Sequence, residues 1–280
     1  MSCSCHVMFL RYSPILLFLI FISIISSNIK GETGPLTKKN VLIKPFNNTI
    51  SAIFVFGDST VDPGNNNCRA TVTKSNFPPY GRDFVNHIPT GRFTNGRLVT
   101  DMMASYIGLK EFVPPYLDPI LSLEELMTGD LMAEGARVIG IVGLPPMGCL
   151  PVVITMKTAG SPLQPRQCID SYSDVGKEYN QLLQNMLKNM NTYGTKIIYA
   201  DIYNPLYDMV QNPNKYGFNN VYSGCCGTGL FELALLCNPN SLVCINASEY
   251  IFWDAVHPTQ ATYYNLFNSL RPTVDVMLKL

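Results

Sequence analysis

Two nearly pure apolar runs enclose a long segment with helical periodicity, and this arrangement constrains the fold more than any other feature. The runs are residues 136–144 (ARVIGIVGL) and 195–203 (TKIIYADIY); Pro145-Pro146 follows the first and Asn204-Pro205 the second. Short runs rich in β-branched residues are typical of strands buried on both faces of a parallel sheet. Strand, helix and strand in this order predict a right-handed βαβ unit, and therefore an α/β domain.

The segment between the two runs is predicted to be an amphipathic helix that ends at Gly194. Apolar side chains recur in it every three or four positions, which is the spacing of one helix face. We expect this stripe to face the core. Its members are Val175, Tyr179, Leu182, Met186 and Met190.

A third apolar run, residues 52–56 (AIFVF), also predicts a buried strand. Shorter helical patterns occupy residues 98–107 and the segment after Pro258, whereas residues 108–135 contain only one helical turn, LSLEELM. Three strands are few for a doubly wound α/β domain of this size, so we expect a thin sheet.

The N-terminus has the pattern of a secretory signal peptide, which we assign to residues 1–31. Arg11 precedes an apolar run of 11 residues, 15–25, and two serines follow it. The run is short for a membrane span, which needs about 20 residues, although a signal anchor is the alternative. The prediction is a secreted, extracellular protein with no stable membrane span after cleavage. In such a protein, Asn47 and Asn246 begin N-glycosylation sequons.

The remaining chain, residues 32–280, has the length and composition of one globular domain. The full chain has 280 residues, of which 47% are hydrophobic, and its formal net charge is zero. With only 14% charged residues, it lacks the basic surface that nucleic-acid binding requires. No lysine and arginine cluster indicates a membrane anchor, and no protein partner can be inferred.

Seven cysteines remain after the signal, and secretion predicts that they form disulfides. Because the number is odd, at least one is free or pairs with another chain. Cys149–Cys168 and Cys237–Cys244 would close short loops. A zinc site is the less favoured alternative, because no C-x-x-C pair or histidine cluster is present. The seven are Cys68, Cys149, Cys168, Cys225, Cys226, Cys237 and Cys244.

Ser59 follows the apolar run 52–56 after Gly57 and Asp58, in the place where parallel α/β sheets carry functional groups. A serine nucleophile needs a histidine base that a carboxylate orients. Asp254 precedes His257 by three residues, so one short turn can bring both side chains together. His87 has no such partner and is expected at the surface. The alternative is that Ser59 only caps the end of a strand. The G-x-S-x-G elbow of α/β-hydrolases does not occur around it.

Seven segments in register resemble the plant GDSL esterase/lipase family and cover nearly the whole chain after the signal. They are FVFGDSTVDPGNNN, GRFTNGRLVTDMMASYIGL, PPYLDP, GARVIGIVGLPPMGCLP, DIYNPLYDMVQNPNKYGF, GCCGTG and FWDAVHPTQATYY. The resemblance implies a flavodoxin-like three-layer α/β/α fold of the SGNH hydrolase superfamily. It implies hydrolysis of small-molecule carboxylic esters or lipids, with Ser59 as nucleophile, His257 as base and Asp254 as its orienting carboxylate. It implies no metal and no cofactor.

The sequence departs from the family pattern near residues 129–130. Gly129 runs directly into DLMAEGARVIG, so the blocks that carry the family's oxyanion-hole glycine and asparagine are missing. The missing piece corresponds to two central strands and their crossovers, about 60 residues or more. The backbone N–H of Ser59 is then the one oxyanion donor that the resemblance supports. The three asparagines at 65–67 are better explained as turn formers.

Two hypotheses follow from the sequence. The chain is either an active secreted ester hydrolase or a catalytically impaired or inactive member, such as a splice product, that lacks the oxyanion-hole glycine and asparagine. Loss of one oxyanion donor costs about 10²–10³ in kcat, and effects of several donors are not additive.

Overall fold

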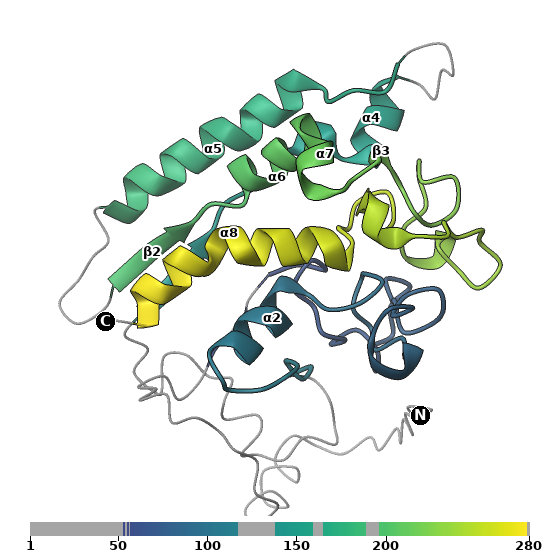
Figure 1. Cartoon of the computed structure of the whole chain (residues 1–280), viewed down its shortest axis with the longest axis horizontal. Helices are drawn as coiled ribbons and strands as arrows, with labels where there is room; N and C mark the ends of the chain where they lie inside the picture. The colour runs from purple at the N-terminus through teal and green to yellow at the C-terminus, as the bar shows by residue number, and fades with distance from the viewer. Residues whose placement is uncertain are drawn as a thin grey trace, which may run out of the picture. The chain divides into compact units, whose positions relative to one another are not determined.

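The predicted strand–helix–strand unit forms as β1, Val138–Val142, α5, Asp170–Lys188, and β2, Lys196–Ala200 (Figure 1). The two strands pair in parallel and in regular register along their whole length. The α/β prediction is therefore confirmed at this level. The computed structural model describes residues 53, 55, 57–116, 138–158, 165–188 and 196–278, which all belong to one compact unit of residues 47–280.

β1 is less buried than its apolar sequence predicts. Val142 is 53% exposed, and no residue of this strand is fully buried. Within the described part of the chain, β2 is the one strand that pairs with it. An apolar run thus indicates a strand, but its burial depends on neighbours that other segments must supply.

The face that α5 turns toward the domain consists mainly of small and polar residues. Asn180 is buried and clamps Leu144 after β1: its Oδ1 accepts from the Leu144 N–H at 2.7 Å, and its Nδ2 donates to the Leu144 carbonyl at 2.9 Å. At Gly176 a Cβ atom would lie 3.0 Å from the Pro145 carbonyl oxygen. The close approach of the loop to the helix explains why these positions are small or polar.

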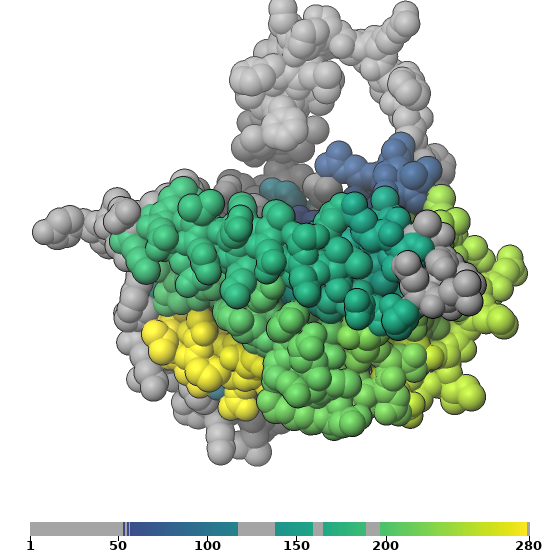
Figure 2. Space-filling model, turned by 90° about the horizontal axis from the view of Figure 1, so that it is seen from above, coloured from purple at the N-terminus to yellow at the C-terminus, as the bar shows by residue number. Residues whose placement is uncertain are grey.

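The prediction that the apolar stripe of α5 faces the core is wrong. The four members of the stripe that the structure describes are exposed, and α5 runs along the surface of the molecule (Figure 2). Helical spacing shows that apolar residues share one face of a helix, but not that this face packs against the core. Here the close approach of the loop after β1 to Gly176 and Asn180 brings the opposite face inward. The exposed fractions are 65% for Val175, 49% for Tyr179, 70% for Leu182 and 54% for Met186. Met190 lies outside the described residues.

The structure contains a second parallel pair that the sequence does not predict. It consists of β3, Asn220–Gly224, and β4, Tyr250–Phe252. The register of this pair shifts between Asn220 and Gly224. β3 contains no apolar run and β4 has three residues, so neither gives the pattern from which strands are predicted.

Helices surround these sheets (Figure 1). The helices expected at residues 98–107 and after Pro258 form as α2, Val99–Tyr106, and α8, Gln260–Leu278. The other α-helices are α4, Pro151–Lys157, α6, Tyr203–Gln211, and α7, Pro213–Tyr216. Single 3-10 turns are η1, Val85–His87, η2, Met147–Cys149, η3, Ala234–Leu236, and η4, Ala247–Glu249.

β4 and the residue after it join two apolar clusters. Ile251 and Phe252 lie in the larger one, with side chains of α2, α6 and α8. Trp253 lies in the smaller one, with Tyr80 and Phe93. All three residues from 251 to 253 are fully buried. The segment that leads to Asp254 and His257 is therefore fixed by packing on both sides.

Three disulfides link six of the seven cysteines, and Cys68 takes part in none of them. The predicted Cys149–Cys168 bond is confirmed. The predicted Cys237–Cys244 bond is wrong, because the observed pairs are Cys225–Cys244 and Cys226–Cys237. The chain at Cys244 runs beside Cys225, where the Cys244 N–H donates to the Cys225 carbonyl at 2.9 Å. Proximity in space thus overrides proximity in sequence.

Several sequence predictions fall outside the described residues: the signal at 1–31, Asn47, the helical turn LSLEELM and the junction at 129–130. Of the run 52–56, the structure describes Ile53 and Val55, and neither lies in a strand. None of the helices in the described part of the chain is both long and apolar enough to cross a membrane.

Candidate active site

Ser59 lies in a tight turn and faces a histidine from the other end of the chain. Its Oγ is 2.7 Å from Nε2 of His257. The Val61 N–H donates to the Asp58 carbonyl, and the Asp58 side chain accepts from the N–H and the hydroxyl of Thr60. These bonds fix the turn that presents Ser59.

His257 and Asp254 form a buried pair. The Nδ1 atom of His257 lies 2.7 Å from Asp254 Oδ2 and 2.9 Å from Oδ1. Asp254 is fully buried and His257 is 2% exposed. Oδ1 of Asp254 also accepts from the backbone N–H groups of Val256 and His257. The carboxylate thus stabilises its own turn and the imidazole, as the three-residue spacing predicts.

The backbone around the pair forms a closed loop between β4 and α8. The Trp253 N–H donates to the His257 carbonyl at 2.7 Å, and the Thr259 N–H donates to the Ile251 carbonyl at 2.9 Å. The ring of Phe93 lies 5.0 Å from the imidazole ring of His257, centroid to centroid. These contacts leave His257 little freedom to turn away from Ser59.

Tyr80 is a member of the site that the sequence analysis missed. Its hydroxyl donates to Asp254 Oδ2 at 2.7 Å, and its ring is buried. Burial raises the pKa of Tyr80, and the negative charge of Asp254 raises this pKa further, so the phenol stays protonated. The sequence signal, a tyrosine after two prolines, contains nothing that indicates this role.

Two contacts connect the segment around Ser59 to the rest of the domain. Tyr263 of α8 donates its hydroxyl to the Thr60 carbonyl at 3.2 Å. Arg92 forms a bidentate ion pair with Asp101 of α2, and its Nη1 donates to the Pro63 carbonyl at 3.2 Å. Buried bidentate pairs of this kind give a defined geometry.

The asparagines at 65–67 serve the turn, in agreement with the sequence interpretation. The Asp62 side chain accepts from the N–H groups of Gly64 and Asn65, and Asn67 donates to the Thr90 carbonyl at 2.8 Å. Among the described residues, His257 supplies the one side-chain hydrogen bond to Ser59 that the structure records. The Ser59 N–H remains the expected oxyanion donor.

The other sequence candidates lie apart from the Ser59–His257–Asp254 arrangement. His87 is exposed and bonded to the Arg82 carbonyl, as a surface residue. Asn246 is exposed at the start of η4, and its Nδ2 donates to Glu249 at 2.9 Å. No group of three or more His, Cys, Asp or Glu side chains that could hold a metal occurs in the described residues.

A groove of about 690 Å³ lies along α2, α8 and η4. Arginine, tyrosine and phenylalanine side chains contribute to its wall, but Ser59, Asp254 and His257 do not line it.

The geometry suits nucleophilic chemistry at Ser59. A carboxylate only accepts hydrogen bonds, so Asp254 holds the proton of the neutral imidazole on Nδ1. The lone pair of Nε2 then faces the Ser59 hydroxyl at hydrogen-bond distance. This is the arrangement in which histidine takes the serine proton as the oxygen attacks a carbonyl carbon.

Several known proteins are similar to this chain in sequence. A family model described as GDSL-like Lipase/Acylhydrolase matches residues 120–270, which is more than half of the chain. The chain is 41% identical to GDSL esterase/lipase At5g45960 of Arabidopsis thaliana over 330 aligned positions, covering 82% of this chain and 88% of that protein. It is 31% identical to GDSL esterase/lipase At2g24560 of Arabidopsis thaliana over 368 positions, covering 96% and 98%.

Both alignments contain more positions than this chain has residues. In the first, 82% of 280 residues, about 230, are spread over 330 positions, so about 100 positions have no residue of this chain. In the second, 96% of 280 residues, about 269, are spread over 368 positions, which again leaves about 100. The chain is therefore shorter than its relatives. It belongs to the GDSL esterase/lipase family, and by family it is a carboxylic ester hydrolase.

Proposed function

We propose that this protein is a secreted, extracellular serine ester hydrolase that acts on small-molecule carboxylic esters or lipids through Ser59, His257 and Asp254. The observation that carries the proposal is the 2.7 Å hydrogen bond between Ser59 Oγ and His257 Nε2, with the other ring nitrogen on a buried carboxylate. No metal or cofactor is required for this chemistry.

The proposed reaction has two steps. Ser59 Oγ attacks the ester carbonyl carbon while His257 takes the hydroxyl proton, and His257 then returns this proton to the departing alcohol. A water molecule, deprotonated by His257, attacks the acyl-enzyme, and His257 then gives this proton to Ser59 Oγ as the acid is released. In both steps Asp254 stabilises the imidazolium, and the Ser59 N–H donates to the negatively charged oxygen.

The missing positions favour a second candidate, in which this chain is catalytically impaired. We infer an internal deletion near residues 129–130 that removes two central strands of a flavodoxin-like sheet, with the family's oxyanion-hole glycine and asparagine. The gap of about 100 aligned positions and the single partner of β1 among the described strands support this inference. Loss of one oxyanion donor would lower kcat by about 10²–10³, and loss of two would lower it further without being additive.

Expression of the full chain through a secretory pathway tests both candidates. The protein is recovered from the medium and assayed with a p-nitrophenyl ester beside Ser59→Ala. Labelling by a fluorophosphonate is measured in parallel: Ser59 Oγ bonds to phosphorus, fluoride leaves and His257 takes the proton. We expect stoichiometric labelling that Ser59→Ala abolishes, with slow turnover. This labelling needs the Ser59–His257 pair but no complete catalytic cycle.

Three outcomes separate the candidates. Serine-dependent turnover in the usual enzyme range of about 1–10³ s⁻¹ would rule out impairment. Labelling with turnover lower by about 10² or more would support it. Turnover that survives Ser59→Ala would contradict the role of Ser59. Transcript sequencing across the codons for Gly129 and Asp130 shows independently whether a segment is spliced out.

A further inference from the structure

Tyr80 occupies a buried position between a backbone donor and the Asp254 carboxylate. Its hydroxyl oxygen accepts from the Ala234 N–H at 2.9 Å and lies 2.7 Å from Asp254 Oδ2. The ring of Tyr80 packs at steep angles against Phe93 and Trp253, with centroids 6.0 and 6.4 Å apart. Tyr80 is 1% exposed, so water does not compete for the hydroxyl.

These contacts determine the direction of the hydroxyl. The Ala234 N–H can only donate, so it takes a lone pair of the Tyr80 oxygen. Asp254 can only accept as a carboxylate, so the Tyr80 proton points to Oδ2. The hydrogen bond is thus charge-assisted and its donor is fixed in position before any substrate arrives.

Asp254 depends on such neutral donors. Oδ1 is satisfied by its own turn, through the N–H groups of Val256 and His257. Oδ2 receives Tyr80 and His257 Nδ1. Within the described residues, the one ion pair recorded for Asp254 is with His257. A buried carboxylate without a cationic partner needs its hydrogen bonds to remain charged.

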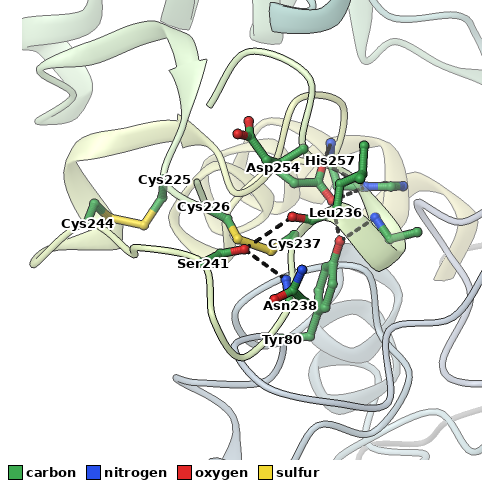
Figure 3. The surroundings of a disulfide bond; sticks show 12 residues. Tyr80, Cys225, Cys226, Leu236, Cys237, Asn238, Ser241, Cys244, Asp254 and His257 are labelled. Carbon is green, nitrogen blue, oxygen red and sulfur yellow. Dashed lines mark hydrogen bonds and ion pairs between the residues drawn. A yellow bond between two sulfur atoms is a disulfide. The ribbon is translucent and has the colours of Figure 1, made fainter. Parts of the chain in front are cut away.

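The donor to Tyr80 is itself fixed by a disulfide. Ala234 has a positive φ of 47°, which is uncommon for a residue with a side chain, and η3 begins there. The Cys226–Cys237 bond closes the loop that contains it. Figure 3 shows Tyr80, Asp254 and His257 beside this disulfide. A continuous series of contacts therefore leads from the disulfide loop through Tyr80 to Asp254 and His257.

We propose that Tyr80 is a positioning residue that orients Asp254, and through it His257, toward Ser59. The inference rests on the proposed function, since it assigns Tyr80 to the same reaction. Tyr80 fixes the carboxylate rotamer through Oδ2, the oxygen that the N–H groups of the turn do not bond. The positive end of its O–H dipole also weakens the hold of Asp254 on the protonated imidazole.

Tyr80→Phe tests the proposal, because it removes the hydroxyl and keeps the ring. Tyr216→Phe is the matched control: it removes another tyrosine–aspartate hydrogen bond, to Asp208, remote from Ser59 in the sequence and not part of the contacts described above. Both variants are made in the full chain, and circular dichroism and thermal unfolding establish that each is folded.

The first readout is the rate of Ser59 labelling by the fluorophosphonate across pH. We expect Tyr80→Phe to lower the maximal rate about 10- to 100-fold and to move the acid limb of the profile to higher pH. Other ionisable groups near the pair are Asp58, Tyr263 and Arg82, which stacks on Trp253, and neither variant alters them. Tyr216→Phe should leave rate and profile unchanged.

The second readout does not depend on Ser59 reactivity. The proton shared by His257 Nδ1 and Asp254 should give a low-field NMR signal, identified by its loss in Asp254→Asn. We expect this signal to shift or broaden in Tyr80→Phe and to persist in Tyr216→Phe. An unchanged signal in a folded Tyr80→Phe variant would overturn the positioning role. Wild-type protein that does not label would contradict the proposed function instead, and the NMR comparison would still decide the role of Tyr80.

Discussion

The two parallel strand pairs of this protein differ in how completely they are packed. β4 is the shorter of the strands compared, yet Ile251 and Phe252 are fully buried, and the loop after it holds Asp254 and His257. β1 has the stronger apolar sequence, yet none of its residues is fully buried and Val142 is 53% exposed.

The histidine–aspartate pair thus follows β4, and not the β1–β2 pair that the apolar runs of the sequence predict. Two disulfides, Cys225–Cys244 and Cys226–Cys237, tie together the loops around β3 and β4. The β1–α5–β2 unit has one disulfide nearby, Cys149–Cys168, and exposes the apolar stripe of α5.

Among the variants considered, removal of a single disulfide should have the largest effect on stability, and it tests whether the two regions are independent. Each of the double variants Cys226→Ser/Cys237→Ser and Cys149→Ser/Cys168→Ser should lower the free energy of unfolding by about 2–5 kcal/mol, measured by urea unfolding. The Cys226–Cys237 variant should also slow fluorophosphonate labelling of Ser59, because its loop carries the Ala234 N–H that holds Tyr80.

The control is the Cys149–Cys168 variant under conditions in which it remains folded. It should label faster than the Cys226–Cys237 variant, because its bond closes no loop that holds Tyr80, even though Cys149 shares the larger apolar cluster with Ile251 and Phe252. Equal slowing in both variants would show that the two regions are not independent.

Gly224→Ala should disturb the pair through a close backbone contact. A Cβ atom at Gly224 would lie 2.6 Å from the carbonyl carbon and oxygen of Asp254, and backbone cannot move aside cheaply. We expect a loss of about 1–3 kcal/mol in stability together with slower Ser59 labelling. Gly217→Ala is the control: its φ is +79°, but nothing lies within 4 Å of the added Cβ. It should cost about 1–2 kcal/mol from backbone strain and leave the labelling rate intact.

Truncation of the exposed Leu182 on α5 should give the smallest effect, and its comparison with the buried Leu187 contrasts the two faces of one helix. Leu182 is 70% exposed and Leu187 is 7% exposed. Leu182→Ala should change the free energy of unfolding by no more than about 0.5 kcal/mol, whereas Leu187→Ala should cost about 2 kcal/mol or more. The measurement is urea unfolding of both variants. A large loss for Leu182→Ala would mean that the predicted core-facing stripe is packed in solution.

The sequence predicts those parts of the fold and site that depend on local spacing. Apolar runs and helical periodicity locate β1, β2, α2, α5 and α8, and the three-residue separation of Asp254 and His257 anticipates their contact. Its resemblance to a known family pairs them with Ser59, which is 198 positions from His257.

The wrong predictions concern features that tertiary contacts determine, namely which face of a helix packs and which cysteines pair. Close packing of Asn180 against Leu144 turns the polar face of α5 inward, and the path of the chain brings Cys244 to Cys225 rather than to Cys237. Tyr80 reaches Asp254 across 174 positions, a relation that no short-range pattern encodes.

The hydrogen bond between Ser59 and His257 also has a kinetic meaning. Contacts between residues so far apart in the chain require closure of a long loop, so they form slowly compared with helices and local turns. A covalent probe of Ser59 that reacts only when His257 is in place therefore reports the late joining of the two ends of the domain. Pulsed labelling during refolding would time that event in a protein with one tryptophan, Trp253, which lies beside Asp254 and supplies a second optical signal.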